Sequence, residues 1–135
     1  MNEELLRSLS LTFSAGCVGG LANGAAVWLS GKLGISKRMG VKIEPAWTPA
    51  WLYPRIVWGG LWGFLFMLPY FQGSILLQGF LYSLAPTAVV LFVVFPYQLK
   101  KGMMGQELGG LTPLFALIVN AVWGVTAVWW LRLTM

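Results

Sequence analysis

Residues 8–31, 56–99 and 108–131 contain no charged side chain. A helix that crosses a bilayer needs about 20 consecutive, mostly apolar residues, because it rises about 1.5 Å per residue through a hydrocarbon core about 30 Å thick. Each uncharged stretch is long enough for at least one such helix. The pattern therefore predicts an all-α integral membrane protein.

The uncharged stretch 56–99 is too long for a single span. It contains a Pro-Tyr-Phe-Gln-Gly-Ser segment at 69–74, and proline, glycine and serine at this density indicate a turn. We therefore predict a bundle of four transmembrane helices in one transmembrane domain over residues 1–135. The predicted spans are 9–30, 54–70, 74–97 and 108–131.

Composition supports a membrane class over a soluble one. The chain is 58% hydrophobic and 10% charged, whereas soluble domains carry about 25% charged residues. The formal net charge of +5 could suggest nucleic acid as a partner. The basic residues flank the predicted spans instead, so we expect the lipid bilayer as partner and no nucleic acid.

The distribution of basic residues predicts the orientation. With four spans, the loops after the first and the third span lie on the same side of the membrane, and basic loops face the cytoplasm. Both termini are then on the non-cytoplasmic side. We expect a multi-pass protein of a bacterial inner membrane, either plasma or photosynthetic. Seven of the nine basic residues fall in the two loops: Lys32, Lys37, Arg38, Lys42, Arg55, Lys100 and Lys101.

Residues 31–53 form the longest segment outside the predicted spans. Its second half is rich in proline, which disfavours a regular helix as far as Pro54. We interpret this segment as a strap on the cytoplasmic membrane surface.

Aromatic residues near the ends of the spans suit the headgroup layer, where a ring is half apolar and half hydrated. Trp47, Trp51 and Tyr53 occupy the strap, and Trp129 and Trp130 lie near the C-terminus. We predict that these five side chains anchor the protein at the two membrane interfaces.

Glycines recur at intervals of four in the first predicted span, at Gly16, Gly20 and Gly24. Gly59 and Gly63 give the second span a smaller version of this face. Faces of small residues let helix backbones approach closely in lipid. Two interpretations follow: the faces pack against each other within the bundle, or they bind another transmembrane chain, including a second copy.

Three carboxamides fall within the predicted spans, at Asn23, Gln78 and Asn120. An amide in hydrocarbon is costly unless it is hydrogen-bonded, so each should face the bundle interior, and Asn23 could bond Asn120. Pro86 lies in the middle of the third span and predicts a helix kink. These residues either stabilise the bundle or line a path for a ligand or an ion.

Several chemistries are excluded by what the sequence lacks. It has no histidine, which removes the usual axial ligand of haem, the commonest zinc ligand and the usual general base. We also expect no charged residue deep within a span and no paired carboxylates for acid–base work. The sequence therefore predicts neither a catalytic residue nor a metal site, and the protein is not expected to be an enzyme.

The stretch from Lys42 to Trp62 resembles the first loop and second helix of the tryptophan-rich sensory protein (translocator) family. That family has a Lys-Pro-x-Trp-x-Pro-Pro run followed by Val-Trp and Leu-Tyr. The corresponding residues here are Lys42, Pro45, Trp47, Pro49, Val57-Trp58 and Leu61-Trp62.

The match is incomplete. Ile43 and Glu44 separate the lysine from the proline, Ala50 replaces the second proline, and the family has five helices. The resemblance implies a tetrapyrrole or sterol-like ligand near Trp47, Trp51 and Trp58.

The leading hypothesis for function is a non-catalytic accessory or assembly subunit of a larger membrane complex, energy-transducing or other, that packs through the glycine faces. The alternative is a small-ligand binder or facilitative carrier with an amide-lined cavity within the membrane. The sequence does not identify a cofactor, and bound lipid is the first expectation. A pigment or quinone site is a third alternative, without a histidine-ligated haem or metal.

Overall fold

The computed structural model describes residues 2–68 and 73–134, and across these ranges the protein is all-helical with no strands. Its α-helices alternate with short segments of 3₁₀ winding (η1 and η3) and one of π winding (η2). The elements in chain order are α1 (Glu3–Lys32), α2 (Ile35–Arg38), α3 (Pro49–Gly63), η1 (Phe64–Met67), α4 (Ile75–Val89), η2 (Val90–Gln98), η3 (Met103–Leu108) and α5 (Thr112–Thr134).

Three helices of the described chain are long and apolar enough to cross a membrane. They are α1, α4 with its continuation η2, and α5. The predicted all-α class and a membrane location are confirmed at this level. α3 has 15 residues and continues into η1. Together, α3 and η1 cover most of the second predicted span. The predicted turn at 69–74 falls largely on residues 69–72, which lie outside the described residues.

The strap is shorter than predicted. α1 runs to Lys32, α2 follows, and α3 already begins at Pro49, so residues 39–48 form the extended part. The expectation that proline excludes a regular helix through Pro54 is wrong for residues 49–54. Thr48 caps α3 by accepting a hydrogen bond from the Trp51 amide at 3.3 Å, and proline is well tolerated at the first helical position.

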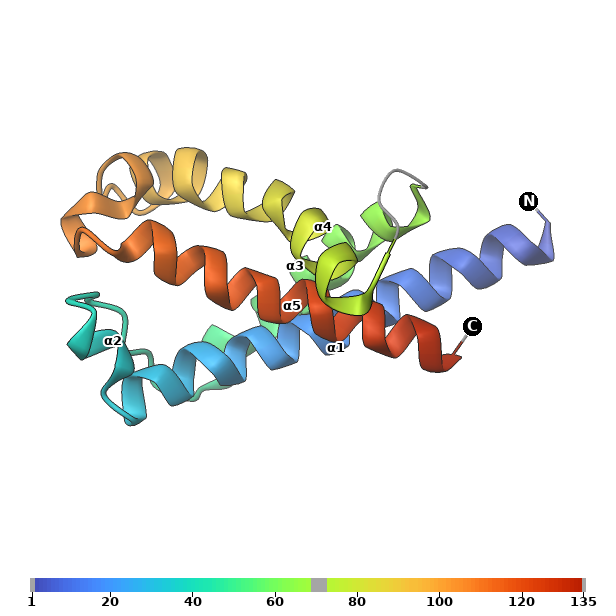
Figure 1. Ribbon diagram of the computed structural model, residues 1–135, viewed down its shortest axis with the longest axis horizontal. Coiled ribbons are helices and arrows are strands. Elements are labelled where there is room, and N and C mark those ends of the chain that lie inside the picture. Colours follow the sequence, from blue (N-terminus) through green and yellow to red (C-terminus); the bar gives the residue numbers. More distant parts are fainter. Residues whose placement is uncertain (1, 69–72, 135) are drawn as a thin grey trace.

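The four longer helices pack in a simple order. α1 lies between α3 and α5, and α5 in turn packs against α4. Both chain termini lie at one end of the bundle, and the segments 33–48 and 99–111 lie together at the other (Figure 1). The Lys42 amide donates to the Leu108 carbonyl oxygen at 2.8 Å, which ties the strap to η3.

Glycines allow the backbones of α1 and α3 to touch. A Cβ atom at Gly16 would overlap the Gly59 carbonyl oxygen, and one at Gly20 would lie 2.5 Å from the Arg55 carbonyl oxygen. A Cβ at Gly63 would overlap the Thr12 carbonyl oxygen, and one at Gly24 would meet the Leu52 side chain. In this structure the two predicted glycine faces meet each other.

A second close contact, which the sequence reasoning did not identify, joins α4 to α5. A Cβ at Gly79 would lie 2.5 Å from the backbone of Val125, and one at Gly124 would overlap the Gly79 carbonyl oxygen. Gly19 brings α1 equally close to α5, because a Cβ there would lie 2.5 Å from the Trp123 carbonyl oxygen. Glycine contacts therefore occur in all three of the main helix–helix pairs.

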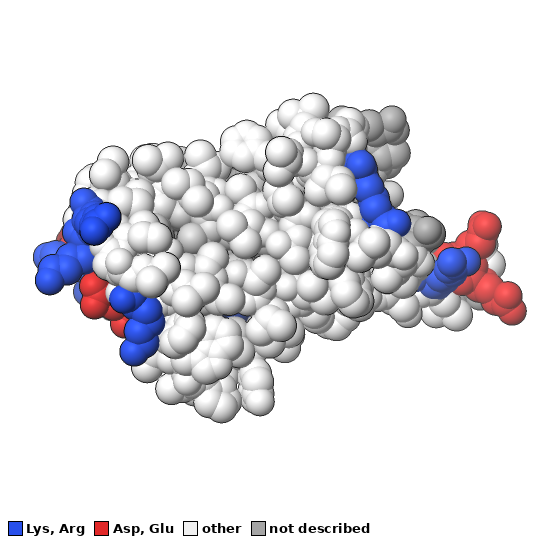
Figure 2. Space-filling view, turned by 60° about the horizontal axis from the view of Figure 1, so that its bottom comes forward, with Lys and Arg blue, Asp and Glu red and all other residues white. Residues whose placement is uncertain are grey.

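Charged side chains gather at the two ends of the molecule and leave a largely uncharged band between them on the face shown in Figure 2. The charged residues of the strap and of the segment before α5 belong to one end. Arg55 is separate from them, because it lies on α3. We call this the basic end, because Lys32, Lys37, Arg38, Lys42, Lys100 and Lys101 lie there.

Candidate functional site

A cavity of about 460 Å³ opens into the bundle at the basic end. Its walls come from α1, α3, η2 and α5. Its charged residues come from α3, from the strap and from the segment before α5. We call it the basic-end cavity. It is lined by Val27, Lys42, Ile43, Glu44, Pro45, Trp51, Arg55, Val90, Val94, Phe95, Leu99, Lys101, Leu108, Phe115, Ala116, Val119 and Asn120.

Arg55 carries a positive charge from α3 into the interior of the bundle. Its Nη1 donates to Asn23 Oδ1 at 2.9 Å, and its Cζ lies 4.5 Å from the centroid of the Trp51 ring. Asn23 precedes the end of α1 at Lys32 by nine positions, or about 14 Å along the helix. The prediction that no charged residue lies deep within the helices is therefore wrong at Arg55.

This correction has a local cause. The second predicted span begins at Pro54, which makes Arg55 a residue of the membrane surface. Because α3 begins at Pro49, Arg55 lies on its second turn instead. The contacts of Gly20 with the Arg55 and Ile56 backbone bring this turn of α3 against α1, where Asn23 is one turn further along.

Asn23 and Asn120 are the centre of a hydrogen-bonded network. Asn23 Nδ2 donates to Asn120 Oδ1 at 3.2 Å and to the Val119 carbonyl oxygen at 2.8 Å. Asn120 Nδ2 donates to Thr87 Oγ1 at 3.1 Å, and Thr87 Oγ1 donates to the Ser83 carbonyl oxygen at 2.8 Å. With Arg55, this network joins α3, α1, α5 and α4, and we call it the amide network.

The amide network provides partners for polar groups that would be costly in an apolar interior. Asn23 is 6% exposed and Thr87 is 4% exposed. Asn120 has both of its amide groups engaged and also lines the basic-end cavity. The network thus stabilises the bundle and presents one polar edge to the cavity.

A smaller cavity of about 130 Å³ lies deeper in the bundle. It shares Arg55, Asn120 and Val90 with the basic-end cavity, and it reaches Pro86 and Trp123. α4 continues through Pro86 and changes to the π winding of η2 at Val90. π-helical segments are uncommon and occur often at functional sites, and here η2 supplies Val90, Val94 and Phe95 to the cavity wall.

Gln78 is not part of this site. It lies in the first turns of α4, where Gln78 Oε1 accepts a hydrogen bond from Arg132 Nη2 at 3.0 Å. Arg132 also donates to the Gly73 carbonyl oxygen at 2.6 Å. Of the three predicted amides, the structure brings Asn23 and Asn120 together and places Gln78 at the end of the bundle that holds the termini.

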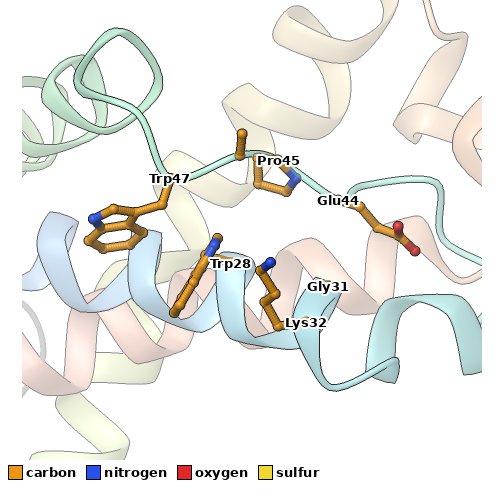
Figure 3. Close-up of a pocket in the computed structure, with 7 residues that line it drawn as sticks. Trp28, Gly31, Lys32, Glu44, Pro45 and Trp47 are labelled. Carbon is orange, nitrogen blue, oxygen red and sulfur yellow. The ribbon is translucent and has the colours of Figure 1, made fainter.

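A second hollow of about 460 Å³ lies between α1 and the strap, and we call it the Trp28–Trp47 groove. Figure 3 shows Trp28 and Lys32 on α1 facing Glu44, Pro45 and Trp47 on the strap. The Trp28 and Trp47 ring centroids are 5.2 Å apart. Tryptophan beside charged groups is typical of the headgroup layer.

The other predicted anchors lie near the two ends of the bundle. The Trp129 and Trp130 ring centroids are 6.3 Å apart near the end of α5, and Tyr53 is 62% exposed on α3. Trp51 instead contacts Arg55 and lines the basic-end cavity.

The tryptophans that the family resemblance places around one ligand do not share a cavity. Trp47 lines the Trp28–Trp47 groove, Trp51 lines the basic-end cavity, and Trp58 lines the small inner cavity. Comparison with protein-family models, with curated proteins and with solved structures finds no match to this chain.

The sequence reasoning missed Arg55, Lys42 and Lys101 as residues of a site. One signal for Arg55 was available, because Thr48-Pro49 is a favourable start for a helix and places Arg55 within it. No comparable signal identifies Lys42 and Lys101, because their proximity depends on how the strap crosses to η3. The arrangement combines cationic groups, an amide and apolar walls, a combination that is typical of a ligand-binding site.

Proposed function

We propose that this protein is a non-catalytic, multi-pass membrane protein that binds a small ligand in the basic-end cavity. The observation that carries the proposal is the cavity of about 460 Å³ that extends from the basic end to Arg55 and Asn120. Ligand pockets commonly have volumes of about 300–1,000 Å³ and combine apolar walls with a few polar groups. A binder or facilitative carrier uses such a cavity without covalent chemistry.

The membrane arrangement that we propose has four spans, with α3 and η1 as the second. Both termini lie at the same end of the bundle (Figure 1), as an even number of crossings requires. The basic end would face the cytoplasm of a bacterial inner membrane, since positive loops stay on that side. The cavity would then open toward the cytoplasm.

The test compares a filled cavity with an intact one. Ala116 is 4% exposed and lines the basic-end cavity, so Ala116→Phe should occupy part of it. Ala121 lies on an outward groove of the same helix, so Ala121→Phe is the matched control. Each variant is extracted gently from native membranes, and released small molecules are identified by mass spectrometry.

We expect a defined molecule to be retained by the unmodified protein and by Ala121→Phe and to be lost from Ala116→Phe. A similar thermal unfolding temperature of both variants shows that the loss is local. Retention by all three proteins, or by none, would contradict binding in this cavity.

An accessory or assembly subunit is the second candidate function. An apolar groove of about 500 Å³ between α4 and α5, lined by Leu76, Phe80 and Ala121 among others, suits a transmembrane helix of a partner. The glycine face of α1 gives this candidate less support, because α3 covers it. Size separation of gently solubilised native membranes tests it, with co-migration in a large complex as the expected result and migration alone as the opposite.

A further inference from the structure

We propose that the ligand of the basic-end cavity is an anionic amphiphile, whose acidic group binds Arg55 and whose apolar chain lies along the cavity wall. This inference rests on the proposed function and adds the chemical class of the ligand. It is carried by the charge of Arg55, by the charges near the cavity mouth and by the apolar walls.

Arg55 has no acidic partner in the described chain. Its guanidinium donates to one neutral amide oxygen, on Asn23, and stacks on Trp51. A guanidinium has five N–H donors, so most of them have no acceptor within residues 2–68 and 73–134. Charged residues inside membrane helices are costly, and they usually face a cavity and pair with a functional partner.

The geometry favours an anion over a neutral acceptor as that partner. A planar guanidinium matches the two oxygens of a carboxylate or phosphate, and such charge-assisted bonds are stronger than neutral ones. Asn23 holds Nη1 and the Trp51 ring covers one face, so the group is fixed in orientation. A fixed fork of donors is suited to an acidic head group.

The other charged residues of the cavity lining also favour an anionic ligand. Lys42 and Lys101 are the other basic residues of the lining, and Glu44 is its one acidic residue. Three positive charges against one negative charge leave the lining positive. A positive cavity raises the local concentration of anions and guides them inward.

The apolar side chains of the cavity wall favour a ligand that has an apolar chain. Val90 and Val94 of η2 face the same cavity as Val27 of α1 and Phe115 and Val119 of α5. These side chains would leave a small inorganic anion largely without partners, whereas an alkyl chain would bury apolar area against them. A single acidic group on one apolar chain therefore fits both parts of the lining.

Two sources supply this chemistry: an acidic lipid of the adjacent leaflet, or an acidic amphiphile from the aqueous phase. Both present an anion at the end of an apolar chain. The identity of the molecule released from the native protein separates them, since an acidic phospholipid points to the bilayer and any other acidic amphiphile to the aqueous phase. Either result supports the proposal, and a neutral molecule overturns it.

The binding experiment uses the full chain in phosphatidylcholine nanodiscs with two radiolabelled probes, oleate and its uncharged methyl ester. We expect saturable oleate binding and affinity for the ester that is lower by about tenfold or more. Arg55→Gln should weaken oleate binding by about tenfold or more and leave ester binding unchanged. Arg38→Gln is the matched control, because Arg38 is exposed at the basic end and does not line the cavity.

Arg55→Lys keeps the positive charge. It provides a second test of the site if the glutamine variant fails to fold. It should bind oleate more tightly than Arg55→Gln and more weakly than the unmodified protein, because the ammonium keeps the charge but not the fork of donors. Equal binding of oleate and ester, or an unchanged oleate affinity in Arg55→Gln, overturns this inference and leaves the proposed function standing. Binding of neither probe to the unmodified protein contradicts the proposed function as well.

Discussion

At the scale of single residues, Arg55 brings a positive charge into the bundle and meets an amide there rather than a carboxylate. Placing arginine at the centre of a membrane helix costs about 2.5–3.5 kcal/mol on insertion scales. A hydrogen bond to Asn23 and the stacking on Trp51 offset part of this cost. In our proposal, a bound anion offsets the rest.

Asn120 provides a separate test of the amide network at this scale. Asn120→Leu removes its hydrogen bonds with Asn23 and with Thr87. Hydrogen bonds between membrane helices average about 0.6 kcal/mol, so the two together should cost about 1 kcal/mol. We expect a lower thermal unfolding temperature in detergent with normal membrane insertion.

The control for Asn120→Leu is Ala121→Leu, which adds apolar volume on the outward groove of the same helix. It should unfold at the temperature of the unmodified protein. If Asn120→Leu were as stable as its control, the network would have no structural role.

At the scale of elements, the contact between α1 and α3 depends on the absence of side chains. Gly16 and Gly59 face each other so closely that a Cβ at Gly16 would overlap the Gly59 carbonyl oxygen. The partner of the α1 glycine face is therefore α3 of the same chain.

Gly16→Ala should force α1 and α3 apart. Overpacking of this kind costs about 1–3 kcal/mol, and we expect a lower thermal unfolding temperature. Gly110→Ala is the matched control, because a Cβ at Gly110 meets no atom within 4 Å. A stable Gly16→Ala protein that instead changes its oligomeric state would show that the face binds another chain.

The sequence predicts the long helices well and the site poorly, for physical reasons. Long uncharged stretches are sufficient to predict α1, α4 with η2, and α5, because lipid excludes charge. Asn23 and Asn120 are recognisable because buried amides need partners.

The position of Arg55 could not be obtained in this way. It depends on the start of α3 at Pro49 and on the glycine contacts that bring α3 against α1. Thr48-Pro49 can indicate the start of the helix, but the approach of Arg55 to Asn23 depends on how α3 packs against α1.

At the scale of the whole molecule, the proposed topology has consequences for both ends of the bundle. Four crossings place the N- and C-termini outside the cytoplasm and Ala46 of the strap inside it. Alkaline phosphatase fused to the C-terminus should be active, since it folds only outside the cytoplasm.

A cysteine label tests the opposite end. Ala46→Cys, at an exposed position of the strap, in a Cys17→Ser background should react with an impermeant thiol reagent only after the inner membrane is opened. An inactive C-terminal fusion combined with an exported N-terminus would indicate three crossings and contradict this topology.

The most direct test of ligand binding is photo-crosslinking in native membranes. A diazirine-bearing residue replaces Val94, which lines the basic-end cavity, or Ile118, which lies on the outward groove of α5 and is 50% exposed. We predict a defined acidic small-molecule adduct at position 94 and a mixture of bulk lipids at position 118. The same adducts at both positions would contradict a selective site in the basic-end cavity.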